Sequence, residues 1–183
     1  MGGDEVTVAR LDALFEQLNA GTSAPNAYMG NEPSFGLPWL YAFVGAPAKT
    51  QAVVRRILTE LFAPTPSGVP GNEDLGAMSS WTVWAMLGLY PAMPGTGGFV
   101  IGSPTFPKMT LSLPKGRTIR ITGKGAAPDA PYVSSLAIDG EQTTSTWIAW
   151  ESIANGATLD FELTREPLSW GSGAGDRPPR WLK

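Results

Sequence analysis

The sequence predicts an α+β protein, with helices in the first half of the chain and strands in the second. Up to about residue 90, apolar residues recur at spacings of three and four, which is the period of an amphipathic helix. After Pro91 apolar and polar residues alternate, and short turn sequences separate the alternating runs. Because the two patterns are segregated along the chain, they indicate an α+β fold or two separate units.

The first two helices are expected at the N-terminal end. Asp4 is a candidate N-cap for the first helix, and Asn19-Ala20-Gly21 is expected to end it. A short second helix is expected over residues 37–44, where Gly45 and Pro47 close it.

Two further helices follow. The third is expected over residues 53–62, with a solvent-exposed face that carries Arg55, Arg56 and Glu60. Residues 63–71 contain three prolines and two glycines and are expected to form a loop. The fourth helix is expected from about Asp74 to Leu89, and its nearly continuous apolar surface predicts burial.

The second half is expected to form a small antiparallel β-sheet or sandwich segment. Its alternating residues are Met109, Leu111 and Leu113; Ile119 and Ile121; Leu136 and Ile138; and Leu159, Phe161 and Leu163. Turn signals separate these runs at Pro114-Lys115-Gly116, Asp139-Gly140 and Asn155-Gly156. The patterns divide the chain into a helical part (1–91), a β-rich part (92–170) and a flexible tail (171–183).

Composition excludes several kinds of chemistry. The 183 residues include no cysteine and no histidine, so the chain has no thiolate or imidazole ligand and no histidine base. Acid–base chemistry then falls to Asp, Glu, Tyr or Lys, and a metal would be a hard, oxygen-ligated one. The net charge is −3 and no stretch clusters Lys and Arg, which argues against a nucleic-acid partner.

The terminal and apolar patterns also limit the interpretation. No run of apolar residues is long enough for a membrane span. The first residues, Met-Gly-Gly-Asp-Glu, lack the basic and apolar regions of a signal peptide, and the chain has the character of a segment from a longer protein.

Two acidic loops carry the candidate functional residues. Asn72, Glu73 and Asp74 lie in a loop bounded by glycine and proline that leads into the fourth helix, and Gly30-Asn31-Glu32-Pro33 precedes the second helix. Backbone N–H groups at a helix start favour negative charge, so such loops can hold an acid in one position. Two of them suggest a polar pocket on a helical scaffold. The alternative is that these acids only cap helices.

A series of short motifs extends this interpretation to a family. In order, they are Arg10-Leu11-Asp12, Gly30-Asn31-Glu32-Pro33-Ser34, Pro38-Trp39-Leu40-Tyr41, Lys49-Thr50-Gln51, Val54-Arg55-Arg56-Ile57, Gly71-Asn72-Glu73-Asp74-Leu75-Gly76, Met78-Ser79-Ser80-Trp81, Leu87-Gly88-Leu89-Tyr90-Pro91 and Ile101-Gly102-Ser103-Pro104. Over roughly residues 1–170 the chain resembles the C-terminal part of glycoside hydrolase family 92, the calcium-dependent exo-acting α-mannosidases.

The resemblance implies an inverting hydrolase that releases terminal α-linked mannose from glycans such as N-glycans, with calcium as cofactor. It implies that Asp74 is the general base. Glu32 would lie in the loop that contacts the terminal sugar and the calcium neighbourhood, Asn31, Asn72 and Glu73 would contact substrate, and Asn31 and Glu32 would be calcium ligands. The resemblance also implies extracellular or periplasmic localisation.

The resemblance further implies that the chain is incomplete. It would form the last helices of an (α/α)6 toroid and a closing β segment. The general acid, a β-sandwich and the remaining helices would belong to the upstream part of the same polypeptide. The chain departs from the family pattern at Asn72, where many members have aspartate, and at Ser34-Phe35-Gly36, where members often have histidines.

Two alternatives stay open. One is a non-catalytic module that binds glycans or a partner protein through a helical scaffold and a β-sandwich. The other is a different (α/α)6 glycosidase or phosphorylase with another sugar specificity.

Overall fold

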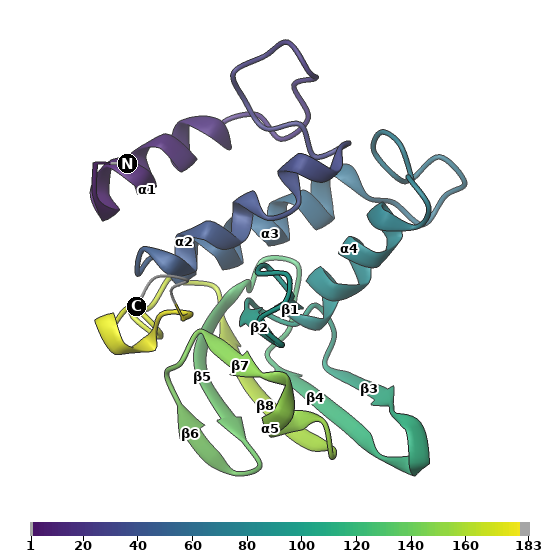
Figure 1. The fold of residues 1–183 in the computed structure, drawn as a ribbon, viewed down its shortest axis with the longest axis vertical. Coiled ribbons are helices and arrows are strands. Elements are labelled where there is room, and N and C mark those ends of the chain that lie inside the picture. Colours follow the sequence, from purple (N-terminus) through teal and green to yellow (C-terminus); the bar gives the residue numbers. More distant parts are fainter. Residues whose placement is uncertain (1, 180–183) are drawn as a thin grey trace.

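The computed structural model describes residues 2–179, in which a layer of helices lies over two β-sheets (Figure 1). The helices are α1 (Asp4–Leu14), α2 (Leu40–Phe43), α3 (Pro47–Leu61), α4 (Ala77–Leu87) and α5 (Trp150–Ile153). Four short 3₁₀ turns are η1 (Glu32–Ser34), η2 (Leu37–Trp39), η3 (Pro114–Gly116) and η4 (Ala174–Asp176). The mixed α+β class is therefore confirmed, whereas the (α/α)6 toroid stays a prediction.

The first and third helices differ from their predicted bounds. Helix α1 ends at Leu14, before the predicted stop signal, and its N-cap is Gly3 rather than Asp4. Helix α3 begins at Pro47, which was expected to close the preceding helix. Proline suits the first helical position because its missing N–H has no partner within the helix there.

The prediction that Arg55 faces solvent is wrong. Its residue is only 4% exposed, and its guanidinium donates hydrogen bonds to the carbonyl oxygens of Pro104 and Ala127. Burial lowers the pKa of this guanidinium from its usual value. Arg55 therefore ties α3 to segments of the β-rich half.

The β-rich half contains two sheets. Strands β1 (Leu89–Tyr90), β2 (Gly98–Ile101) and β7 (Trp147–Ala149) form an antiparallel sheet in the order β1-β2-β7. The second sheet has the order β3-β4-β8-β5-β6, with β3 (Lys108–Ser112), β4 (Thr118–Lys124), β5 (Tyr132–Ile138), β6 (Glu141–Thr143) and β8 (Ala157–Thr164). Strands β4 and β8 pair in parallel, so the prediction of a purely antiparallel sheet is wrong.

Local turn chemistry explains the hairpin between β5 and β6. Ile138 pairs with Glu141, which leaves Asp139 and Gly140 as a two-residue turn. Their φ angles are 50° and 87°, as a hairpin turn with two left-handed residues requires. The turn predicted at Asp139-Gly140 is confirmed.

The apolar residues form two clusters. One joins the helices and includes Trp39, Tyr41 and Trp81, and the other lies in the β-rich half around Ile121, Leu136 and Phe161. Helix α4 is less buried than predicted, because the side of the helix that carries Val83 is exposed. None of the helices within residues 2–179 has the length and apolar character that a membrane crossing requires.

The described part of the tail contacts the rest of the chain. The carbonyl oxygen of Asp176 accepts hydrogen bonds from the amide and hydroxyl of Thr146, and its carboxylate accepts one from Thr144. Arg177 pairs with Asp4 at 2.7 Å, which brings the tail to the start of α1. Residues 180–183 of the predicted flexible tail lie outside the described residues.

Candidate active site

The two acidic loops, predicted from separate parts of the sequence, lie against each other. The backbone N–H of Asn72 donates a 3.3 Å hydrogen bond to the carbonyl oxygen of Gly30. Gly71 and Gly30 are in direct backbone contact, because a Cβ added to Gly71 would overlap the Gly30 carbonyl. This contact brings Asn31 and Glu32 to the same side of the molecule as Asn72, Glu73 and Asp74.

The first loop is fixed at both of its ends. The N–H of Gly30 donates to Oδ1 of Asn19 at 3.2 Å, which anchors the loop to the segment after α1. Beyond η1, the carbonyl oxygen of Phe35 accepts a 3.0 Å hydrogen bond from the indole N–H of buried Trp81 on α4. Glu32 is therefore held on an exposed turn between two anchored points.

The second loop has an unusual backbone. Asp74, Leu75 and Gly76 are all left-handed, with φ angles of 45°, 59° and 90°. Residues with a side chain rarely adopt this region, and such conformations often occur at functional sites. The left-handed stretch delays the start of α4 to Ala77 and leaves the side chain of Leu75 fully exposed.

Glu73 accepts hydrogen bonds from the start of the helix that follows it. Its Oε1 accepts a 3.2 Å hydrogen bond from the N–H of Ser79, and its carbonyl oxygen accepts one from the N–H of Met78. Both donors belong to the first turn of α4, where N–H groups have no partner within the helix. The capping interpretation is therefore correct for Glu73, whereas its role in substrate binding stays a prediction.

Asp74 and Glu32 are electrostatically coupled. The pKa of Asp74 is raised above its usual value. The largest cause is shielding from water, followed by the charge of Glu32, a hydrogen bond between the two carboxyl groups and the charge of Glu73. Asp74 itself is exposed in this chain. The site therefore presents an exposed carboxylate whose affinity for a proton is increased, which is a property of a general base.

The described residues do not complete a metal centre. Within residues 2–179, no three His, Cys, Asp or Glu side chains gather in an arrangement that could hold an ion. Asn31 is half-buried and Glu32 is exposed. Calcium binds six to eight oxygen atoms, so these two side chains would be part of a ligand set at most.

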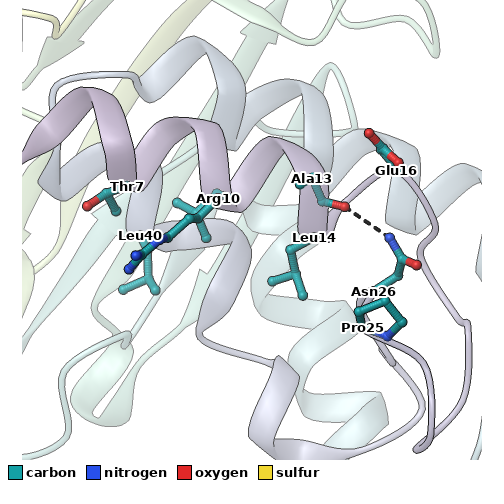
Figure 2. Close-up of a pocket in the computed structure, with 9 residues that line it drawn as sticks. Thr7, Arg10, Ala13, Leu14, Glu16, Pro25, Asn26 and Leu40 are labelled. Carbon is teal, nitrogen blue, oxygen red and sulfur yellow. Dashed lines mark hydrogen bonds between the residues drawn. The ribbon is translucent and has the colours of Figure 1, made fainter. Parts of the chain in front are cut away.

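Two hollows lie on the helical layer. Figure 2 shows one of about 580 Å³, where Thr7, Arg10 and Leu14 of α1 face Leu40. The side-chain amide of Asn26 donates a 2.9 Å hydrogen bond to Ala13 beside it. A second hollow of about 480 Å³ lies between α3 and α4 and is lined mainly by apolar residues. These hollows are apolar surfaces of the helical layer rather than candidate catalytic pockets.

Sequence reasoning missed two features of the site. Trp81 is buried, and no sequence signal indicates that its indole N–H donates to the carbonyl oxygen of Phe35. The contact of Gly71 with Gly30 is visible only in the structure. The repeated pairing of a glycine with an asparagine before each acid is the one signal in the sequence that accompanies this contact.

The chain thus combines a layer of helices over a β-rich half with carboxyl groups on two adjoining loops. The family model described as the glycosyl hydrolase family 92 catalytic domain matches residues 1–165. The chain belongs to glycosyl hydrolase family 92.

Known relatives share the fold over nearly the whole chain. A family GH92 α-mannosidase from Bacteroides thetaiotaomicron, solved in complex with mannoimidazole, superposes with a TM-score of 0.90 at 28% identity and 98% coverage of this chain. A family GH92 inverting mannosidase from the same organism gives a TM-score of 0.88 at 29% identity and 100% coverage. An uncharacterized secreted glycosidase from Arthroderma benhamiae is 37% identical over 98% of this chain.

These relatives are much longer. The chain spans 23% of the Arthroderma protein and 25% and 27% of the two Bacteroides structures. It therefore represents about a quarter of a protein of this type.

Proposed function

We propose that this chain is the C-terminal part of an exo-acting α-mannosidase that hydrolyses terminal α-linked mannose from glycans with inversion of configuration. The observation that carries the proposal is the meeting of the two acidic loops, which couples Asp74 to Glu32 at an exposed site. The likeness to an inverting mannosidase and to an α-mannosidase bound to mannoimidazole supports the same reaction. The secreted relative supports an extracellular site of action.

Asp74 is the proposed general base. A base must accept a proton from water, and the raised pKa of Asp74 increases the driving force for that transfer. Glu32, on the adjoining loop, would orient the carboxyl group of Asp74 and contact the sugar. Asn31 and Asn72, beside these acids, are the proposed amide contacts to sugar hydroxyls.

The general acid is proposed to lie outside this chain. An inverting glycosidase separates its two carboxyl groups by ~6.5–9.5 Å, so that sugar and water fit between them. Glu32 raises the pKa of Asp74 from the adjoining loop, so it is assigned to orient the base rather than to act as the acid. The acid would therefore come from the upstream part of the same polypeptide, which would also close the substrate pocket.

Calcium is proposed only for the whole protein. Asn31 and Glu32 offer the oxygen ligands that calcium prefers, and upstream side chains, backbone carbonyls and water would supply the rest. Chelation of the whole protein should then abolish mannose release, and calcium should restore it better than zinc. Turnover that is unchanged by a strong chelator would remove calcium from the proposal.

The central test uses the whole protein and an aryl α-mannoside. Replacing the proposed base, as in Asp74→Ala, should lower kcat by about 10²–10⁴-fold, because a positioned base contributes that much. NMR of the first product should show β-mannose, as inversion requires. Glu166→Ala, at an exposed position far along the chain, is the matched control and should keep normal turnover.

Other results would favour the alternatives. Turnover retained by Asp74→Ala would make Asp74 a structural residue of the loop. Glycan binding by the whole protein without hydrolysis would favour a binding module. Release of a different sugar would favour another glycosidase specificity.

A further inference from the structure

We infer that Gly30 and Gly71 are positioning residues, whose backbone-to-backbone contact fixes the loop of Asp74 relative to the loop of Glu32. This inference rests on the proposed function of Asp74 as the base. In this inference, two glycines that have no side chain determine where the carboxyl group of Asp74 lies. The contact between them is named the glycine clasp below.

The contact has no room for a side chain on Gly71. An added Cβ would overlap the carbonyl oxygen of Gly30 and would lie 2.5 Å from its Cα. Real Cβ atoms do not approach backbone atoms this closely, so the two loops would have to move apart. The φ angle of Gly71 is 73°, which also favours glycine.

Gly30 is constrained from the other side. A Cβ at this position would lie 3.0 Å from the Cα of Gly71 and 2.9 Å from the ring of Tyr28. The φ angle of Gly30 is not in the left-handed region, so backbone conformation does not demand glycine there. Close approach is therefore the physical reason for glycine at this position.

The clasp connects two anchored structures. On one side, the N–H of Gly30 is held by the side chain of Asn19 at 3.2 Å. On the other side, Glu73 is bonded to the first turn of α4 through Met78 and Ser79. The 3.3 Å hydrogen bond from Asn72 to Gly30 crosses between them. Asp74 lies two residues after Asn72, so separation of the loops would move its carboxyl group.

A small displacement would be costly for the reaction. Effective positioning requires reacting groups to be placed to within about 1 Å, and a misplacement of that size can lower a rate by about 10²-fold. The two loops carry only part of the proposed sugar site, because the upstream part of the polypeptide is proposed to close the substrate pocket. Loss of the clasp should therefore lower kcat far more than it raises KM.

The test compares two glycine-to-alanine variants of the whole protein. Gly71→Ala adds both a left-handed alanine and the backbone clash. The matched control is Gly21→Ala, where φ is 87° and no atom lies within 4 Å of the added Cβ. The control carries the same backbone penalty without the contact. We expect Gly71→Ala to lower kcat on an aryl α-mannoside by about 10²-fold with a KM change of a few-fold at most, and Gly21→Ala to keep both values.

A double-mutant cycle links the effect to the base. If Gly71→Ala acts by displacing Asp74, it should have no further effect on kcat in the Asp74→Ala background. An equal loss of kcat in both backgrounds would show a general structural effect and would overturn the inference. An unchanged kcat in Gly71→Ala would overturn it as well.

A crystal structure of the Gly71→Ala protein supplies a readout that is independent of turnover. We expect the hydrogen bond from Asn72 to Gly30 to be broken and the loop of residues 71–76 to be displaced by about 1 Å. A native arrangement of both loops in that crystal would show that the clasp does not set their separation. Full turnover by Asp74→Ala would instead overturn the proposed base, and with it the catalytic role of the clasp.

Discussion

The guanidinium of Arg55 donates a hydrogen bond of 3.0 Å from Nη2 to the carbonyl oxygen of Pro104, where the helical layer meets the β-rich half. Its Nη1 donates to the carbonyl oxygen of Ala127 at 2.5 Å. One buried side chain thus satisfies two backbone acceptors on the opposite layer. Arg55 therefore links the two layers.

Arg55→Leu should therefore destabilise the fold. The change keeps the apolar stem but leaves two carbonyl groups without their charged donor, and hydrogen bonds to charged groups contribute about 1.5–3 kcal/mol each. We expect a loss of about 3 kcal/mol in the free energy of unfolding, measured by denaturant titration of the whole protein. Arg120→Leu, on the exposed face of β4, is the control and should change little. Equal stability of the two variants would contradict this account.

Trp81→Phe tests the anchor of the first acidic loop. Phenylalanine retains much of the apolar contact but removes the N–H that donates to Phe35, which leaves a buried carbonyl at a cost of about 1–3 kcal/mol. We expect lower thermal stability and a higher KM for an aryl α-mannoside, because the loop of Glu32 loses one attachment. Trp84→Phe, a half-buried position on the same helix, should have the smaller effect on KM. A larger effect at Trp84 would refute the anchor.

Tyr90 should make the fold sensitive to alkali. Burial raises the pKa of Tyr90 to about 12, above its usual value near 10. Between these two values the folded state binds the proton more tightly than the unfolded state does, so stability falls as pH rises from about 10 to about 12. Tyr90→Phe retains the stacking on Trp39, whose ring centroid lies 5.0 Å away, and should reduce this fall. Thermal melting at pH 8 and pH 11 measures the difference, and an identical fall in both proteins would disprove it.

The isolated 183 residues should release no mannose and should self-associate. The proposed general acid lies outside the chain, and the hollow between α3 and α4 is flanked by Val69 and Val83, which are 39% and 58% exposed. Exposed apolar patches promote association. Light scattering during gel filtration should show species larger than a monomer, and an aryl α-mannoside with calcium should not be hydrolysed.

Two results would contradict that prediction. Turnover similar to that of a complete glycosidase, abolished by Asp74→Ala, would show that the acid lies within this chain. Monomeric behaviour at high concentration would show that the exposed apolar residues do not drive self-association. Val83→Lys, which adds a charge to an exposed position of α4, is expected to reduce the association and serves as its internal control.

Local sequence was sufficient to predict those elements that depend only on residues close together in the chain. The alternating residues of β4 and β8 identify strands because side chains alternate between the two faces of a sheet. The turn at Asp139-Gly140 is predictable because only a few residue types adopt two successive left-handed conformations. The two acidic loops were visible for the same reason, since glycine, proline and acids at a helix start have local physical causes.

The tertiary structure decided the features that depend on segments far apart in the chain. Periodicity could not show that β4 and β8 pair in parallel, because strand direction leaves no mark in a single strand. Arg55 was assigned to solvent because charge alone predicts exposure, and only the carbonyl groups of Pro104 and Ala127 make its burial favourable. The sequence by itself determined which residues lie in the two acidic loops. Only the fold, through the backbone contact of Gly30 with Gly71, brought Glu32 to Asp74 and raised the pKa of that carboxyl group.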